Sequence, residues 1–243
     1  MSQSSVLLEL KGVHTHIGAY HILHGVNLQI PRGELTLLLG RNGAGKTTTL
    51  RTIMGLWQAS QGKIHFNGHD ITGMATPDIA SLNIAYVPEN MGIFSDLTVE
   101  ENMLLAARKA TRATQIETDR LTWIYAMFPA VEKFWHHPAG KLSGGQKQML
   151  AVARAMVEPR DLLIVDEPSK GLAPAIVQNM IEAFQKMKAS GVTILLVEQN
   201  IHFAQQLGDS VAVMDNGRVI HAGSMAALSA DPTLQQSLLG LAL

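Results

Sequence analysis

The sequence predicts an α/β fold built around a mostly parallel sheet. Three short apolar runs, at residues 35–39, 162–165 and 192–197, are rich in Leu, Ile and Val and do not alternate with polar residues. Such runs are typical of parallel strands that are covered on both faces. Helical patterns lie between them, and a glycine-rich segment follows the first run, which is the strand, loop and helix order of α/β proteins.

The parts of the chain around this core differ in pattern. Residues 6–67 contain LLELKGV, VNLQI and GKIHF, separated by turn residues, and predict an antiparallel N-terminal β subdomain. Residues 91–158 are mostly helical in pattern, and Thr98 with Glu101 predicts a capping box at a helix start. We expect one domain over residues 5–240, with the helical subdomain (about 91–158) inserted in the core.

Composition narrows the function classes. The chain has 243 residues, of which 47% are hydrophobic, and this is enough for a sizeable core. The net charge of -1 gives no basic field for a nucleic-acid partner, and the lack of cysteine excludes disulfides, thiolate metal sites and thiol catalysis. No stretch approaches 18 apolar residues, so we expect a cytosolic chain that another protein docks to any membrane.

A phosphate loop follows the first apolar run. GRNGAGKTT fits the pattern G-x-x-x-x-G-K-[ST], so the core is predicted to be that of a P-loop NTPase. The glycines allow backbone N–H groups to point inward, Lys46 would reach the β- and γ-phosphates, and Thr47 would bind Mg²⁺. The candidate nucleotide-binding residues are Gly40, Asn42, Gly43, Ala44, Gly45, Lys46, Thr47 and Thr48.

Two carboxylates end the second apolar run. Asp166 and Glu167 follow LLIV, and sites in parallel sheets lie at the carboxyl ends of the strands. Asp166 would therefore face the metal shell of Thr47. Glu167, one residue further, would lie near the γ-phosphate and orient or deprotonate water.

A second glycine-rich helix start, LSGGQ, lies at residues 142–146. It is either an anion site or a simple helix-capping turn. With the phosphate loop before it and LLIVDEP about twenty residues after it, the chain resembles the ATPase subunits of ATP-binding cassette (ABC) transporters. The resemblance implies that two such domains pack head to tail, with each ATP between the phosphate loop of one and the LSGGQ of the other. The signature residues acting on the partner's nucleotide would be Ser143, Gly144, Gly145 and Gln146.

Four shorter strings resemble one branch of that family. YVPEN, MFPAV, SKGLAP and LLVEQN are similar to the second ATPase of branched-chain amino acid importers and of relatives that import amides, urea or other small solutes. The branch implies ATP and Mg²⁺ as cofactors, a second ATPase subunit of the same or another kind, and two membrane permease subunits. It also implies an external solute-binding protein, no nucleic acid, and a location at the cytoplasmic face of the inner membrane.

Three departures from the family pattern concern the catalytic site and the dimer interface. Glu89 stands where most relatives have Gln, and we expect it near the metal, although it adds negative charge beside phosphate. Gln199 stands where most have His, and we take it with Glu167 as a catalytic candidate. Its amide can bond the γ-phosphate or hold Glu167, but it cannot shuttle a proton. Ala173 stands where many relatives have Asp in the loop that crosses the dimer interface. Together, Gln199 and Ala173 suggest that the two sites of a dimer need not be equal.

Two further expectations concern contacts. In the family that this chain resembles, an aromatic residue usually stacks on adenine at the position near Ile17. Here either Ile17 packs on the base or Tyr20 stacks on it, and we favour Ile17. Met91, Ile93 and Phe94 follow Glu89 in the segment that, in such transporters, contacts a short permease helix. Ordinary core packing is the alternative for these three.

Other functions remain open on the sequence. One alternative is a soluble cassette ATPase for assembly, and the VPEN, GLAP and VEQN strings argue against it. Another is a regulatory module with little turnover, which only Gln199 suggests. His14, His16, His21, His24, His136 and His137 lack the spacing of metal ligands. Co-purification with a polytopic membrane protein would separate the importer from the other classes.

Overall fold

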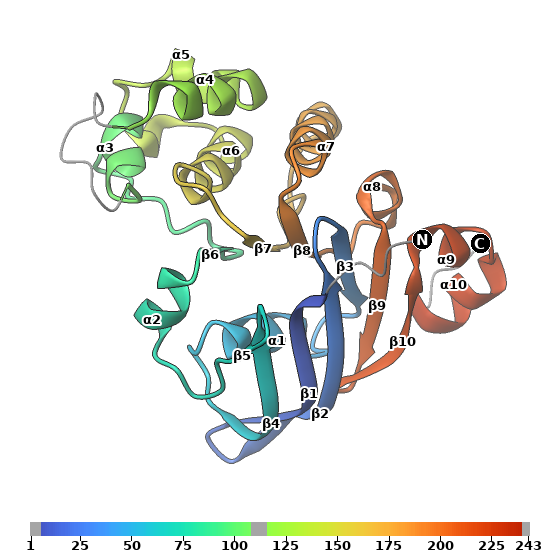
Figure 1. Ribbon diagram of the computed structural model, residues 1–243. Helices are drawn as coiled ribbons and strands as arrows, with labels where there is room; N and C mark the ends of the chain where they lie inside the picture. Colours follow the sequence, from blue (N-terminus) through green and yellow to red (C-terminus); the bar gives the residue numbers. More distant parts are fainter. Residues whose placement is uncertain (1–5, 108–115, 240–243) are drawn as a thin grey trace.

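The computed structural model describes residues 6–107 and 116–239. The expected domain limits, residues 5 and 240, lie outside this part. Two sheets and a set of helices form the fold (Figure 1). The first sheet is antiparallel, with the order β2-β1-β4-β5, and comprises β1 (Val6–Ile17), β2 (Tyr20–Pro31), β4 (Ala59–Phe66) and β5 (His69–Asp70).

The second sheet has the order β10-β9-β3-β8-β7-β6 and is parallel except for its edge strand β10. Its strands are β3 (Leu35–Gly40), β6 (Ile84–Val87), β7 (Leu162–Asp166), β8 (Thr193–Val197), β9 (Ser210–Asp215) and β10 (Arg218–Ser224). The mostly parallel core and the antiparallel N-terminal sheet are both confirmed. β6, β9 and β10 were not predicted, because short or alternating segments give a weak strand pattern.

The helices fall into three groups. Helix α1 (Lys46–Ile53) contacts β2 on one side and β3 and β7 on the other, so it lies between the two sheets. Between β6 and β7 the chain forms α3 (Val99–Leu104), α4 (Thr118–Met127), α5 (Pro129–Lys133), a 3₁₀ turn (Ala139–Lys141) and α6 (Gly144–Ala155). The remaining helices are α2 (Thr76–Ser81), α7 (Pro174–Ala189), α8 (Ile201–Leu207), α9 (Met225–Ser229) and α10 (Pro232–Leu239).

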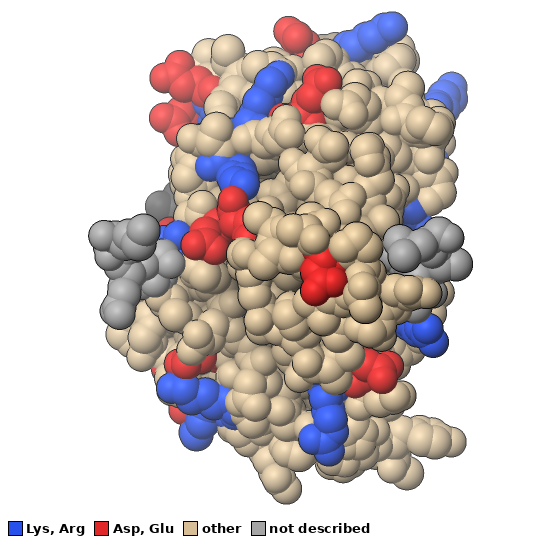
Figure 2. All heavy atoms as spheres, turned by 90° about the vertical axis from the view of Figure 1, so that its right-hand side faces the viewer, with Lys and Arg blue, Asp and Glu red and all other residues tan. Residues whose placement is uncertain are grey.

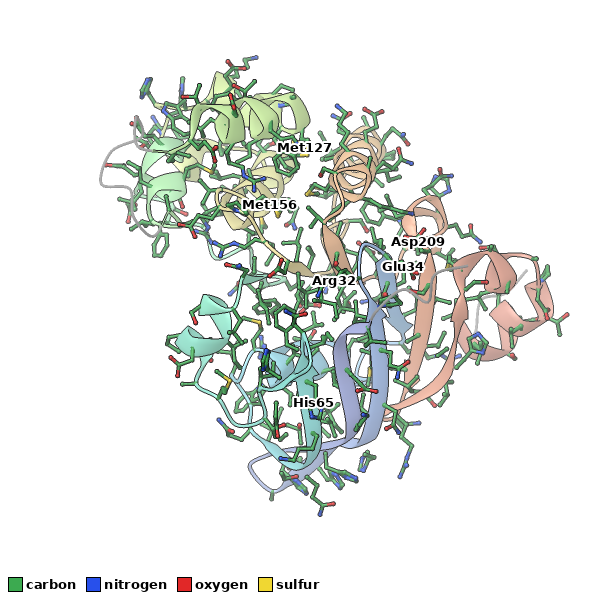
Figure 3. The ribbon with its side chains drawn as sticks, viewed as in Figure 1. Arg32, Glu34, His65, Met127, Met156 and Asp209 are labelled. Atoms are coloured by element: carbon green, nitrogen blue, oxygen red, sulfur yellow. The ribbon has the colours of Figure 1, made fainter. Side chains whose placement is uncertain are left out.

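Apolar residues form two cores, one on each face of the parallel sheet. The first joins the sheet to α7 and to the helices α3 to α6, which we call the helical layer, and it includes Met127 and Met156 (Figure 3). The second fills the space around α1, between the two sheets. Strands β3, β7 and β8 are buried along their length, which explains their unbroken apolar sequences.

The predicted capping box at the start of α3 is confirmed. The Thr98 hydroxyl accepts from Glu101 N, and the Glu101 carboxylate accepts from Thr98 N. At the surface, Figure 2 shows the face with α9 and α10, where charged side chains of both signs lie scattered among neutral ones. No described helix is long and apolar enough to cross a membrane.

Candidate nucleotide site

Four loops converge at one edge of the parallel sheet. β3, β6, β7 and β8 all run in the same direction, so their carboxyl ends lie together. The glycine-rich loop follows β3, Asp166 ends β7, the Glu198–Asn200 segment follows β8, and Glu89 is the second residue after β6. Sequence segments more than 150 residues apart thus meet at one place, since residue 42 and residue 199 are hydrogen-bonded.

The glycine-rich loop leads directly into α1. Gly40 has a φ of 149°, and a Cβ at this position would lie 2.3 Å from the carbonyl oxygen of Met214, so only glycine fits. Lys46 is 5% exposed, and its ammonium donates to the carbonyl oxygens of Gly40 (2.8 Å) and Arg41 (3.1 Å). The loop therefore surrounds a positive charge at the start of a helix, an arrangement that suits an anion.

Thr47 and Asp166 are brought together, as expected. The Thr47 hydroxyl donates to Oδ1 of Asp166 at 3.3 Å, and the Tyr86 hydroxyl lies 3.5 Å from Oδ2. Burial raises the pKa of Asp166 to about 6, and the negative charges of Glu167 and Glu89 add to this effect. A hydroxyl and a buried carboxylate are oxygen donors of the kind that Mg²⁺ prefers.

Glu167 is held from two sides. Its φ of 49° is unusual for a residue with a side chain, and its N–H donates to the Val197 carbonyl at 2.9 Å. One carboxylate oxygen lies 3.7 Å from Lys46 Nζ and accepts a short hydrogen bond from the Gln199 amide. The same amide nitrogen donates to Oδ1 of Asn42 at 2.7 Å. Of the two expected partners of Gln199, the structure brings Glu167 to it directly.

Glu89 lies at the same edge but pairs with a residue that we had not singled out. Its carboxylate is 2.6 Å from the ammonium of Lys170, which is also 3.5 Å from Glu167. Glu89 is close enough to Asp166 for its charge to raise the Asp166 pKa. Lys170 lies in the SKGLAP string, in which the sequence singles out only Ala173.

The second glycine-rich segment caps helix α6. The Ser143 hydroxyl accepts from Gln146 N at 3.3 Å, while Gln146 Oε1 accepts from Ser143 N at 2.8 Å. Gly145 is buried, and a Cβ there would lie 2.6 Å from Ile176 of α7. Ser143 and Gly144 are exposed. Capping and close packing thus explain Ser143, Gly145 and Gln146 within one chain, but they do not explain the exposed Gly144.

The expected adenine contacts lie at the end of the β1–β2 hairpin. Ile17 pairs with Tyr20 across the turn. Tyr20 is 76% exposed, whereas Ile17 is half-buried. The two side chains are therefore neighbours, and both are accessible from solvent.

Sequence reasoning missed Glu198, which is 2% exposed. Its carboxylate accepts from the N–H and the hydroxyl of Ser169, both at 2.9 Å, and from the N–H groups of Gln199 (3.1 Å) and Asn200 (3.2 Å). Burial raises its pKa, although these hydrogen bonds oppose the rise. Glu198 therefore joins the segment after Glu167 to the segment that carries Gln199. An acidic residue directly after a buried strand was the available signal.

Known proteins are similar to this chain over most of its length. The family model described as "ABC transporter" matches residues 23–170. The chain is 38% identical, over 96% of its length and 100% of the relative's, to the high-affinity branched-chain amino acid transport ATP-binding protein BraG of Pseudomonas aeruginosa. It is 32% identical to the methionine import ATP-binding protein MetN of Rhizobium etli, over 96% of this chain and 66% of that protein.

Among solved structures, the ATP-binding subunit of an ABC transporter is 32% identical and superposes with a TM-score of 0.79. The aligned region covers 97% of this chain and 95% of that one. The matched family model spans the glycine-rich loop, LSGGQ and the Asp166–Glu167 pair. The chain therefore belongs to the ABC transporter family, as one of its ATP-hydrolysing subunits.

Proposed function

We propose that this protein is the ATPase of an importer for branched-chain or related amino acids. The similarity to BraG over nearly the whole length of both chains supports this solute class. The similarity to a methionine importer subunit supports amino acids more broadly. The permease and the external receptor would choose the solute, because the ATPase does not contact it. Urea and amides are therefore the alternative solutes.

The nucleotide would bind with its phosphates in the loop formed by residues 40–48. Lys46 would exchange its carbonyl contacts for phosphate oxygens, and the N–H groups at the start of α1 would face the same charge. Thr47 and Asp166 would hold Mg²⁺, with Glu89 at the edge of its shell. When bound, the ion would neutralise phosphate charge during the transfer of the γ-phosphoryl group to water.

Glu167 would act on the attacking water. Its carboxylate lies between Lys46 and Gln199, so its direction is fixed before any substrate arrives. A fixed carboxylate can orient a water molecule and accept its proton. Gln199 has no proton to exchange at neutral pH, and its part would be to hold Glu167 in place, with Asn42 as its second anchor.

A second ATPase subunit would complete each site. The exposed start of α6 lies on the helical layer, whereas the phosphate loop lies at the end of β3 (Figure 1). Ser143, Gly144 and the N–H of Gly145 would therefore meet the nucleotide of a partner, with Gln146 supporting Ser143 through the cap. A homodimer and a heterodimer both fit this arrangement.

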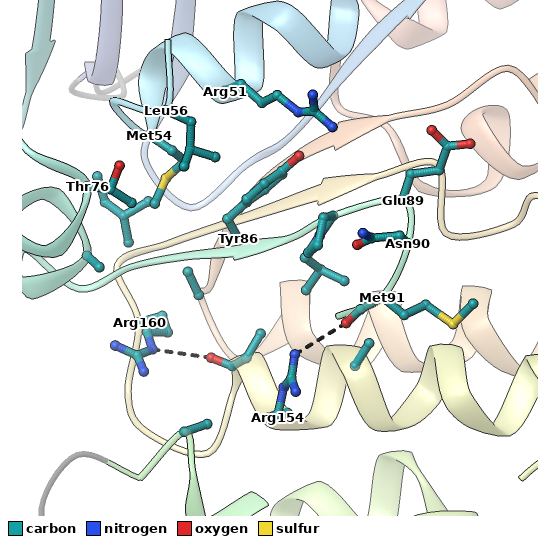
Figure 4. Close-up of a pocket in the computed structure, with 18 of the residues that line it drawn as sticks. Arg51, Met54, Leu56, Thr76, Tyr86, Glu89, Asn90, Met91, Arg154 and Arg160 are labelled. Atoms are coloured by element: carbon teal, nitrogen blue, oxygen red, sulfur yellow. Dashed lines mark hydrogen bonds between the residues drawn. The ribbon is translucent and has the colours of Figure 1, made fainter. Parts of the chain in front are cut away.

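The permease would dock in a groove of about 1140 Å³ between the sheet and the helical layer (Figure 4). Its wall includes apolar residues such as Met54, Leu56 and Met91, together with Arg154, which donates to the Met91 carbonyl at 3.3 Å. Phe94 is 53% exposed, and its ring centre lies 5.7 Å from the Arg154 guanidinium. Met91 and Ile93 also pack partly on the core. Two permease subunits docked in this way would keep the protein at the cytoplasmic face of the inner membrane, below an external solute-binding protein.

The observation that carries the proposal is the position of Glu167 beside Lys46 and Gln199, next to the Thr47–Asp166 pair. The test is Glu167→Gln, with Glu182→Gln on the exposed face of α7 as control. We expect ATP binding to persist, hydrolysis to fall by about 100-fold or more, and ATP to trap a dimer in light scattering. Unchanged turnover in Glu167→Gln would reject this role.

A further inference from the structure

Three carboxylates and two ammonium groups gather at the nucleotide site. Asp166, Glu167 and Glu89 supply the negative charges, and the charges of Glu167 and Glu89 both raise the pKa of Asp166, behind the effect of burial. Lys46 lies 3.7 Å from Glu167 and compensates one carboxylate. Without a second cation, the site would face a polyphosphate with two uncompensated negative charges.

Lys170 is placed to be that second cation. Its N–H donates to the Glu167 carbonyl at 3.2 Å, so the chain turns back after Glu167. The turn brings the Lys170 ammonium to 2.6 Å from Glu89 Oε1 and 3.5 Å from Glu167 Oε2. The hydrogen bond to Glu89, followed by the charge of Glu167, raises the Lys170 pKa, so the ammonium stays charged.

The Glu167 carboxylate is therefore shared between two groups of contacts. Oε1 faces Lys46 and the Gln199 amide, whereas Oε2 faces Lys170. Removal of Lys170 would leave Oε2 without its cation and would leave Glu89 unpaired nearby. The like charge of Glu89 would then act directly on Glu167 and on bound phosphate.

Glu89 also belongs to a second feature. Glu89, Asn90 and Met91 line the groove of Figure 4, on the side where Arg154 holds the Met91 carbonyl. The Lys170 ammonium thus connects Glu89, in the wall of this groove, with the carboxylate of Glu167. Lys170 contacts both carboxylates directly.

We propose that Lys170 is a positioning residue for ATP hydrolysis, which neutralises Glu89 and thereby keeps both nucleotide affinity and the alignment of Glu167. This inference rests on the proposed role of Glu167. Lys170 also couples the Glu89 segment of the groove to Glu167, because its ammonium pairs with both carboxylates. A displacement of that segment would therefore change the charge environment of the hydrolytic carboxylate.

An ordinary surface ion pair would behave differently. The Lys170 and Glu89 side chains are 57% and 46% exposed, and exposed pairs contribute little to folding stability. Lys63 and Asp70 form a pair with similar exposure, 60% and 42%, on the antiparallel sheet. Lys63→Met is therefore a matched control for the loss of one exposed, paired lysine.

The experiment is a double-mutant cycle with Lys170→Met, Glu89→Gln and the double variant, alongside Lys63→Met. The first readout is the dissociation constant of the Mg²⁺ complex of the non-hydrolysable analogue AMP-PNP, which needs no turnover. The second is the separate measurement of kcat and KM for ATP, and the third is the thermal unfolding midpoint. Glu167→Gln, measured beside them, tests the proposed function by itself.

We expect Lys170→Met to weaken AMP-PNP binding about fivefold and to lower kcat about tenfold, with an unchanged unfolding midpoint. Glu89→Gln in the same chain should return the binding constant to within about twofold of the wild-type value. The inference would be overturned if Lys170→Met weakened AMP-PNP binding equally with Glu or with Gln at residue 89. It would also be overturned if the effect of Lys170→Met were no larger than that of Lys63→Met. Normal turnover in Glu167→Gln would instead defeat the proposed function, while the binding cycle still decides whether Lys170 neutralises Glu89.

Discussion

The side-chain amide of Gln199 donates to the Glu167 carboxylate and to Oδ1 of Asn42. This contact joins three loops, those after β3, β7 and β8, through one planar group. A Gln amide has two N–H donors and one oxygen, so it can hold two acceptors and still present its oxygen elsewhere. The direction of Glu167 therefore depends on a residue that takes no part in proton transfer.

Replacement of Gln199 by Ala should lower kcat by about tenfold with little change in KM for ATP. The loss is expected because Glu167 keeps its charge but loses the donor that orients it. Steady-state ATPase assays would measure both constants. Gln205→Ala, in the same α8 region but bonded to Gln235, is the control and should leave both unchanged. A rise in KM with normal kcat would mean that Gln199 serves binding instead.

Much of this site followed from sequence because the chemistry sits in contiguous segments. The glycine-rich loop and the Asp166–Glu167 pair each lie directly after a short, unbroken apolar run, and such a run bounded by turn residues indicates a buried strand. The rule that sites form at the carboxyl ends of parallel strands then brings the segments together. Thr47 and Asp166 are 119 residues apart in sequence but lie within hydrogen-bond distance.

The rest depends on packing that no local pattern encodes. Lys170 and Glu89 are 81 residues apart, and their pairing follows from the turn after Glu167. The sequence does not show whether the carboxylate of Glu198 points to solvent or inward. Its role as a buried acceptor becomes visible only from its burial and its hydrogen bond with Ser169. The edge strand β10 lacked an unbroken apolar run, because most of its residues are exposed.

Replacement of Ser143 by Ala should cost about 1 kcal/mol of folding stability, because Gln146 N loses its side-chain acceptor. Thr98→Ala removes the equivalent cap of α3 and should cost a similar amount. Only the Ser143 variant should also weaken ATP-dependent dimers in a Glu167→Gln background. Light scattering and thermal unfolding measure the two effects. Equal dimerisation of the two variants would restrict Ser143 to helix capping.

Phe94→Asp should disturb assembly without disturbing the fold. The ring is 53% exposed, so the change in stability should stay within about 0.5 kcal/mol. Nucleotide affinity should match the wild type, while co-purification with co-expressed permease subunits should fall strongly. Ile220→Asp, at an equally apolar and 49% exposed position on β10, is the control for a new surface charge. Weaker nucleotide binding in Phe94→Asp would assign the ring to the core.

Asp166→Asn should stabilise the protein in the absence of nucleotide. Burial raises the pKa of Asp166 from 3.8 to about 6, so holding the carboxylate ionised at neutral pH costs on the order of 3 kcal/mol as an upper limit. The amide removes that cost and keeps an oxygen for the Thr47 hydroxyl. The additional stabilisation by ATP with Mg²⁺, compared with ATP and a chelator, should disappear. Differential scanning fluorimetry gives both values, and a lower midpoint without nucleotide would contradict the account of Asp166.

Glu198→Ala should destabilise the fold more than any other change considered, by about 3 kcal/mol. The buried carboxylate is the acceptor for four donors, and its loss would leave the N–H and hydroxyl of Ser169 without a partner. Glu198→Gln keeps one acceptor oxygen for the donors that share Oε2, so its cost should be about half as large. Urea unfolding measures the difference. Because Ser169 leads to Lys170 and Asn200 follows Gln199, both variants should also lower kcat, and an unaffected kcat in Glu198→Ala would show that Lys170 and Gln199 hold their positions without this buried connection.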